Sequence, residues 1–279
     1  MTPVSRLLSL VIAVSVSSVL STEAAAQDRR MVDAGGHRLE LILLGDGNPA
    51  VVFDAGMSGG MAGWTTARDS VALHTRTVTF ERAGFGESEE GPSPRTAEQL
   101  AMELRTALRN AGVEFPVVLV GHSAGGMFSV VYTSLYPRDV AGLVLVDPAT
   151  DYAYDHMRDN DPARWENRSD PATWAEGWDA PAGWVGQMEA LPQSVEQFKD
   201  SWPLPDIPTV VVTALSPVGG YPLESAEDML RWERFQSALV ARIPGAKHVV
   251  FPDANHGSIL GETVLREKII EVIARVSGR

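Results

Sequence analysis

One run of ten residues decides the fold: Val117-Val118-Leu119-Val120-Gly121-His122-Ser123-Ala124-Gly125-Gly126. Its first four residues are continuously apolar, which is typical of a parallel strand buried on both faces. The Gly-x-Ser-x-Gly pattern that follows leads into residues 127–135, which predict a helix ending before Pro137. A strand, a tight glycine turn and a helix are the context in which a serine hydroxyl is exposed at the carboxyl end of a strand. We therefore predict that Ser123 is a nucleophile.

Alternating strands and helices extend outward from this run. A threonine and a glutamine form a capping-box pattern at the start of a helix expected over residues 96–111, and Gly112 ends it. A last helix carries its apolar residues on one face between residues 264 and 276. This alternation predicts an α/β fold with a doubly wound, mostly parallel sheet and helices on both faces. Besides 117–120, the strands are expected at residues 38–44, 50–54, 75–81, 143–146, 209–212 and 247–251.

Residues 151–208 interrupt this alternation. They lack the pattern of a buried strand and carry five of the seven tryptophans: Trp165, Trp174, Trp178, Trp184 and Trp202. A segment this long between two core strands predicts an inserted helical cap over a site, with the core at residues 27–150 and 209–279. The tryptophans either line a largely apolar pocket for an acyl or aromatic group or pack the cap onto the core. The sequence leaves both interpretations open.

The first 26 residues have the layout of an export leader. Arg6 gives a positive start, residues 7–20 form an apolar, serine-containing run, and residues 24–26 are alanines that suit a cleavage site. The run is too short and too rich in serine to span a membrane comfortably. We expect a signal peptide at residues 1–26, a periplasmic or secreted protein, and no stable membrane span after the leader is removed. An uncleaved anchor is the alternative.

Charge and composition limit the partners. The formal net charge of −13 argues against nucleic acid and anionic membrane surfaces. The chain has no cysteine, so it has no disulfide, no thiolate metal site and no cysteine nucleophile. It also has no HExxH pattern, and we expect neither a metal nor a cofactor. The expected partner is a small, uncharged acyl substrate, and the oligomeric state is left open.

A serine nucleophile needs a base, and His256 is the best candidate. It lies in a polar loop between the last predicted strand and the last helix, from which an imidazole can reach Ser123. His248 falls inside a strand, where we expect it to pack. We expect the side chain of His122, the neighbour of the nucleophile, to point away from the site. The remaining histidines fall before the elbow, in loops or in the cap: His37, His74 and His156.

The chain resembles bacterial members of the α/β-hydrolase superfamily over residues 31–279. The resemblance implies the α/β-hydrolase fold and a hydrolase mechanism, and it does not imply a substrate. Glu81 stands where the family usually has aspartate, and we expect it to brace the turn. The resemblance rests on Phe53-Asp54-Ala55-Gly56, Glu81-Arg82-Ala83-Gly84-Phe85-Gly86-Glu87-Ser88, the run from Val120 to Gly126, Leu143-Val144-Leu145-Val146-Asp147, and Asn255-His256-Gly257.

The same resemblance implies an oxyanion hole built from two backbone N–H groups. One belongs to Ala124, the residue after the nucleophile. The other comes from the loop after the strand at residues 50–54, which points to Met57. Ala55 replaces the histidine that is usual in this loop, and a backbone donor tolerates that change.

The acid partner of His256 is less determined. Many relatives place it after the strand that corresponds to residues 209–212, where this chain has no carboxylate. The preceding strand ends in Asp147, next to the strand of the nucleophile. We favour Asp147 as the triad acid. One alternative is a site without an orienting acid, and the others lie later in the chain: Glu224, Glu227 and Asp228.

Together these residues predict a serine hydrolase that cleaves a carboxylic ester or lactone through an acyl-Ser123 intermediate. An amidase, a peptidase or a cofactor-free perhydrolase would use the same residues. Dehalogenase and epoxide hydrolase chemistry uses an aspartate nucleophile, which Ser123 disfavours. A hypothesis of another class is a non-catalytic binding protein on the same scaffold, which we would expect to lose Ser123 or His256.

Overall fold

The computed structural model describes residues 27–218 and 225–278. The predicted leader, residues 1–26, and the candidate acid Glu224 lie outside the described residues.

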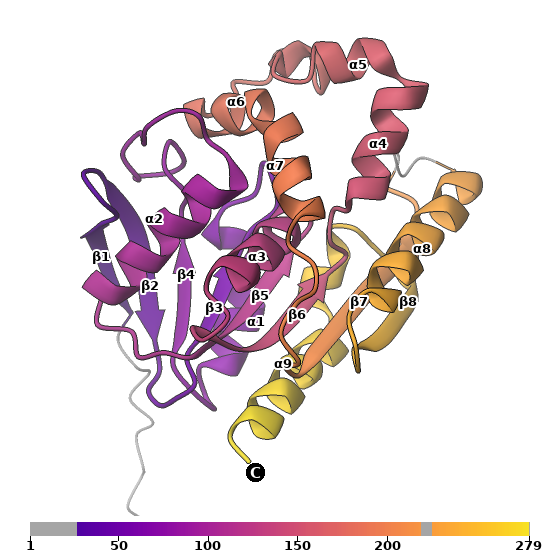
Figure 1. Cartoon of the computed structure of the whole chain (residues 1–279). Helices are drawn as coiled ribbons and strands as arrows, with labels where there is room; N and C mark the ends of the chain where they lie inside the picture. Colours follow the sequence, from indigo (N-terminus) through magenta and orange to yellow (C-terminus); the bar gives the residue numbers. More distant parts are fainter. Residues whose placement is uncertain (1–26, 219–224, 279) are drawn as a thin grey trace, which may run out of the picture.

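A single eight-stranded sheet forms the centre of the described chain, in the order β1-β2-β4-β3-β5-β6-β7-β8 (Figure 1). β2 pairs antiparallel with β1 and β4, and the other neighbours pair in parallel. All strands predicted from the sequence are present, whereas β1 was not predicted because its charged residues give no apolar run. The strands are β1 (Asp28–Asp33), β2 (Arg38–Leu44), β3 (Val51–Asp54), β4 (Thr77–Phe80), β5 (Val117–His122), β6 (Val140–Val146), β7 (Thr209–Ser216) and β8 (Lys247–Asn255).

Helices cover both faces of the sheet, as the alternation predicts. Val117 and Leu119 of β5 pack into an apolar cluster with α2 and α3, and the alternate residues Val118 and Val120 pack into a second cluster with α1 and α9. Because alternate residues point to opposite faces and both faces are buried, the strand is a continuous apolar run. The core helices are α1 (Thr65–Val71), α2 (Ala97–Asn110), α3 (Ala124–Leu135), α8 (Ala226–Ala241) and α9 (Thr263–Val276).

Two helix starts follow from local sequence. The hydroxyl of Thr96 accepts from the backbone N–H of Gln99, which caps α2, and Gly112 ends the helix with a φ of 74°. α3 begins at Ala124, three residues before the predicted start, so that no linker separates Ser123 from the helix.

Helices fill the long insertion between β6 and β7. Figure 1 shows α4, α5 and α6 together at one end of the molecule, while α7 returns to pack against α2 and α3. The elements are α4 (Asp151–Asn160), α5 (Pro162–Glu166), η2 (Pro171–Thr173), α6 (Ala182–Glu189) and α7 (Leu191–Lys199). The division of the chain into a core and a separate cap domain stays a prediction.

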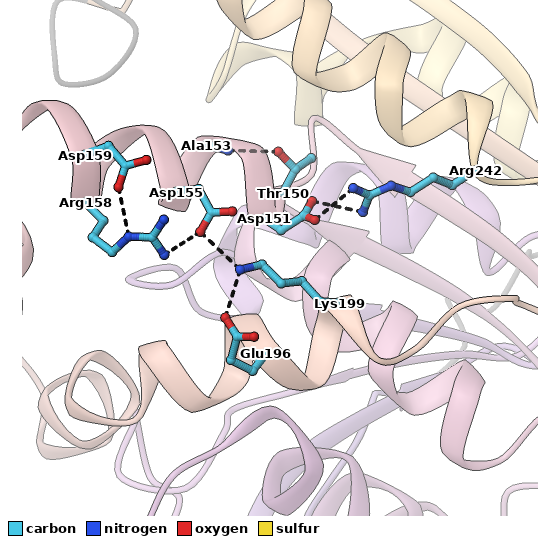
Figure 2. A network of polar contacts seen from close by, with 9 residues as sticks. All are labelled: Thr150, Asp151, Ala153, Asp155, Arg158, Asp159, Glu196, Lys199 and Arg242. Atoms are coloured by element: carbon cyan, nitrogen blue, oxygen red, sulfur yellow. Dashed lines mark hydrogen bonds and ion pairs between the residues drawn. The ribbon is translucent and has the colours of Figure 1, made fainter.

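A polar network fastens the first insertion helix (Figure 2). Asp151, at the start of α4, receives two hydrogen bonds from the guanidinium of Arg242 at the end of α8, at 2.9 and 3.1 Å. One turn later Asp155 accepts from Lys199 of α7 at 3.2 Å. α4 is therefore tied both to the core and to the last insertion helix.

Within residues 27–218 and 225–278, no helix is long and apolar enough to cross a membrane. The same described residues contain no group of three or more side chains suited to hold a metal ion.

Candidate active site

Ser123 lies at a strained turn between β5 and α3. Its φ of 53° and ψ of −123° place a non-glycine residue in a sparsely populated region of backbone space. Gly121 and Gly125 make the turn possible. A Cβ on Gly121 would lie 2.4 Å from the carbonyl oxygen of Gly125, and a Cβ on Gly125 would lie 2.4 Å from that of Ala55. The glycines of the motif are therefore required by close backbone approach.

His256 follows directly after β8, and its ring meets the carboxylate of Asp147. The imidazole Nδ1 donates to Oδ2 of Asp147 at 2.6 Å. Asp147 follows β6 and is fully buried. Ser123 and His256 line one cavity, so the structure brings together the three residues that the sequence predicts for a triad.

Backbone strain coincides with these residues. In the described part of the chain, the two non-glycine residues with positive φ are Ser123 and Asp147, the latter at 45°. Strain of this kind costs about 1–3 kcal/mol per residue and gathers where a function requires it. The observation favours Asp147 over the other carboxylates as a member of the site.

The alternative acids that the structure describes serve a different purpose. Asp228 forms a capping box with Ser225 at the start of α8 and accepts from Arg231 at 2.7 Å. Glu227 is exposed and faces the same arginine. Both carboxylates belong to the surface end of α8.

The second oxygen of Asp147 is occupied as well. Its Oδ1 accepts from the indole N–H of Trp232 at 2.7 Å and from the backbone N–H of Ala214 at 3.0 Å. Ala214 belongs to β7, the strand after which many relatives carry the acid; here that strand supplies a donor instead. Sequence reasoning missed Trp232, because a tryptophan on an ordinary amphipathic helix carries no signal of this contact.

The prediction for His122 was wrong. Its ring does not point away from the site but lies 4.5 Å from the ring of His256, centroid to centroid. Nε2 of His122 donates to the carbonyl oxygen of His256 at 2.8 Å, so the loop after β8 folds back over the end of β5. Burial lowers the pKa of His122 well below its usual value, which keeps the ring neutral. His248 packs in β8 as expected, 2.8 Å from the hydroxyl of Thr213.

The loop after β3 lies directly against Ser123. A Cβ on Gly56 would be 3.3 Å from Cβ of Ser123. The buried guanidinium of Arg82 donates to Asp54 at 2.5 Å, to the carbonyl of Ala55 at 2.8 Å and to that of Gly56 at 2.5 Å. One cation thus holds the side chain at the end of β3 and the two carbonyl groups that follow it.

This contact orients the peptide that precedes Met57. The bond between Gly56 and Met57 is trans, and in a trans peptide the carbonyl and the following N–H point in opposite directions. Because Arg82 holds the carbonyl of Gly56, the N–H of Met57 faces away from Arg82. Ala124, the other predicted donor, is the first residue of α3, where N–H groups have no partner within the helix.

Two acidic groups support the same loop. Burial raises the pKa of Asp54 to about 6, although Arg82 acts in the opposite direction. Glu81 accepts from the backbone N–H of Met61 at 2.9 Å, and burial raises its pKa too. The side chain of Glu81 therefore supports the loop after β3, whereas in its own turn the backbone carbonyl of Glu81 accepts from the hydroxyl of Ser88 at 2.7 Å.

The cavity around Ser123 has a volume of about 320 Å³ and an apolar wall. No aspartate, glutamate, lysine or arginine of the described residues lines it. Both interpretations of the cap tryptophans hold in part: three of the five line the cavity, whereas Trp202 packs edge-on against Phe198 and Trp165 lies under Arg168. The lining residues are Met57, Ser58, Ser123, Ala149, Ala153, Tyr154, Met157, Trp174, Trp178, Trp184, Met188, Val218, Trp232 and His256.

Comparison with known proteins agrees with this fold. The profile of the family described as alpha/beta hydrolase fold matches residues 49–200, more than half of the chain. The chain belongs to the alpha/beta hydrolase fold family.

The relatives share only parts of their length with this chain. It is 34% identical over 108 residues to the (Lyso)-N-acylphosphatidylethanolamine lipase of Bos taurus, which is 38% of this chain and 31% of that protein. It is 30% identical over 151 residues to the "Probable transporter efuK" of Hormonema carpetanum, 51% of this chain and 22% of that protein. The chain therefore spans less than half the length of these relatives.

A solved structure matches nearly the whole chain. The thermophilic esterase from Thermogutta terrifontis superposes with a TM-score of 0.66 at 21% identity, over 89% of this chain and 99% of the esterase. At this identity the match shows a shared fold.

Proposed function

We propose that this protein is a serine hydrolase that cleaves a carboxylic ester or lactone through an acyl-Ser123 intermediate. The observation that carries the proposal is the hydrogen bond between His256 and the fully buried Asp147, next to a strained serine in the same cavity. A relative named as a lipase and a structural neighbour named as an esterase support the class of reaction.

The chemistry follows from the positions of these groups. Nε2 of His256 takes the proton of Ser123 while Oγ attacks the carbonyl carbon. Asp147 holds the ring in the required tautomer and stabilises the imidazolium that forms. The N–H groups of Met57 and Ala124 stabilise the oxyanion. His256 then protonates the leaving alkoxide, and a water activated by the same ring releases the acid.

The cavity indicates the substrate class. An apolar wall without charged side chains favours an uncharged acyl or aryl group. Burial raises the pKa of Tyr154, so its phenol stays neutral in this wall. Amides, peptides and peroxide chemistry on the same triad are the competing reactions. The leader pattern of residues 1–26 makes export to the periplasm or the medium part of the same proposal.

Covalent labelling with a fluorophosphonate tests the proposal. The native protein should take up one label, and Ser123→Ala should take up none. Ser58→Ala is the matched control, because Ser58 lines the same cavity away from the elbow, and it should still be labelled. Turnover on a panel of p-nitrophenyl esters, lactones and aryl amides then ranks the substrates. A native protein that takes up no label and hydrolyses none of the panel would contradict the proposal.

A further inference from the structure

We infer that Trp232 is a positioning residue for the triad acid: its indole N–H fixes one oxygen of Asp147 and leaves the other to His256. The inference rests on the proposed function, since it assigns a partner to the acid of that site.

The two carboxylate oxygens of Asp147 have separate partners. Oδ2 faces Nδ1 of His256, while Oδ1 receives the N–H groups of Trp232 and Ala214. The carboxylate of Asp147 is shielded from solvent, because Asp147 is fully buried and Trp232 is 5% exposed. A buried carboxylate without hydrogen-bond donors is costly, and here three N–H groups contact its two oxygens.

The position of Asp147 in the sheet explains why it needs a donor from a helix. It follows β6, whereas His256 follows β8, and β7 lies between the two strands. The carboxylate must therefore reach over the end of β7, where Ala214 offers one backbone N–H. α8 follows β7 in the chain and brings Trp232 to the same place, as the carboxylate's second donor on Oδ1.

Trp232 also contacts the base. Its ring meets that of His256 edge-on, with 6.2 Å between centroids and 88° between planes, and it forms part of the cavity wall. One rigid side chain thus borders the acid, the base and the substrate. With Oδ1 held twice, the carboxylate cannot rotate away from Nδ1, and the tautomer of His256 is fixed.

Loss of the indole N–H has a defined electrostatic consequence. Oδ1 keeps only the donor from Ala214, so hydrogen bonds neutralise less of the negative charge of the carboxylate. An imidazolium beside it then holds its proton to higher pH, and the active neutral base appears at higher pH. The midpoint of the acidic limb of the pH profile of kcat/KM should therefore move to higher pH. A purely structural role of Trp232 would not cause this shift.

The test is Trp232→Phe, which keeps an aromatic ring and removes the donor. We expect kcat to fall roughly tenfold or more, from the loss of a hydrogen bond to a charged group. The midpoint of the acidic limb should rise in the same variant. Trp64→Phe is the control, because Trp64 is also buried beside the site, against His122, but its Nε1 donates to no described residue. That variant should keep the wild-type midpoint.

A measurement on the wild type keeps the inference testable if Trp232→Phe does not fold. The Nε1–H proton resonance of Trp232 should titrate with the midpoint of the acidic limb of kcat/KM, because the indole reports on the charge of the pair that it contacts. In an Asp147→Asn background, Trp232→Phe should cause no further loss of kcat.

The outcomes separate the inference from the proposed function. A wild type that takes no fluorophosphonate and hydrolyses no ester refutes the proposed function. An active wild type whose Trp232 resonance does not titrate with the activity, or a folded Trp232→Phe with the wild-type midpoint, overturns the inference alone.

Discussion

Two buried aspartates lie at the ends of the strands on either side of β5, the strand that leads into Ser123, and they differ in their partners. Asp54 ends β3 and pairs with Arg82 at 2.5 Å. Asp147 follows β6 and pairs with His256 at 2.6 Å. Both sit at the carboxyl edge of a parallel sheet, where polar groups of the sheet converge. Their place in the sheet therefore does not separate a supporting acid from a catalytic one.

The nature of the partner separates them. A guanidinium stays protonated at every physiological pH, so Arg82 cannot take or return a proton, and its bond to Asp54 holds structure. An imidazole can take and return a proton during a reaction, so the partner of Asp147 can act as a base and then as an acid. We interpret the β3 side as the support of the oxyanion loop and the β6 side as the acid–base side.

The largest effect expected from this difference is that of Asp147→Asn. An amide leaves Oδ1 as acceptor for Trp232 and Ala214 but turns an N–H₂ toward His256, which disfavours the productive tautomer. We expect kcat to fall by about 10⁴-fold while the fold is retained, as for such a change at a triad acid. Initial rates on the best ester, with a thermal unfolding curve for each variant, measure both quantities.

Asp228→Asn is the matched control for this prediction. Asp228 is the N3 residue of the capping box of α8 and pairs with Arg231, and asparagine keeps a side-chain oxygen that can accept from the backbone N–H of Ser225. Its kcat should stay close to that of the wild type. A wild-type rate for Asp147→Asn would mean that Asp147 is not the acid partner of His256, and a later carboxylate would have to take that role.

Much of the candidate site at the carboxyl edge of the sheet could be predicted from the sequence, because it depends on local sequence patterns. A buried strand followed by Gly-x-Ser-x-Gly predicts the elbow around Ser123, and chain order predicts His256. Asp147 could be favoured because a carboxylate directly after a buried strand lies at the same edge as the nucleophile. Each of these inferences uses only the residues next to a strand end.

The contacts between these positions could not be predicted, since they join elements that are distant in the chain. His122 approaches His256 only because the loop after β8 folds over β5. Trp232 reaches Asp147 from α8 across 85 residues of chain, with no local pattern at either end. α1 was missed for a related reason, because its seven residues are too few for a clear helical period.

The next effect in size is that of Arg82→Met, on the β3 side. Removing one member of a buried ion pair costs about 3–5 kcal/mol of unfolding free energy. It also frees the carbonyl of Gly56, so the N–H of Met57 loses its fixed direction. We expect kcat to fall up to about 10²-fold with a smaller change in KM, the size of a lost oxyanion donor.

The double variant Arg82→Met/Asp54→Asn separates the two consequences. Removing the unpaired acid should restore part of the unfolding free energy, measured in urea. The rate should stay low, because no cation holds the loop. If kcat returned with stability, Arg82 would support the fold alone and the β3 side would have no part in catalysis.

The smallest effect expected is a pH dependence that belongs to Asp54. Burial raises its pKa from the ordinary 3.8 to about 6, so the folded protein binds this proton more tightly than the unfolded chain does. The stability that Asp54 contributes is complete below about pH 3.8 and is lost as the pH rises through about 6, a change of ~3 kcal/mol. Position 54 does not titrate in Asp54→Asn, so the wild-type unfolding free energy minus that of the variant should fall over this interval. Urea unfolding at a series of pH values gives the difference. A constant difference would mean that Asp54 and Arg82 stay ionised throughout, and the two aspartates would then differ only in the geometry of their partners.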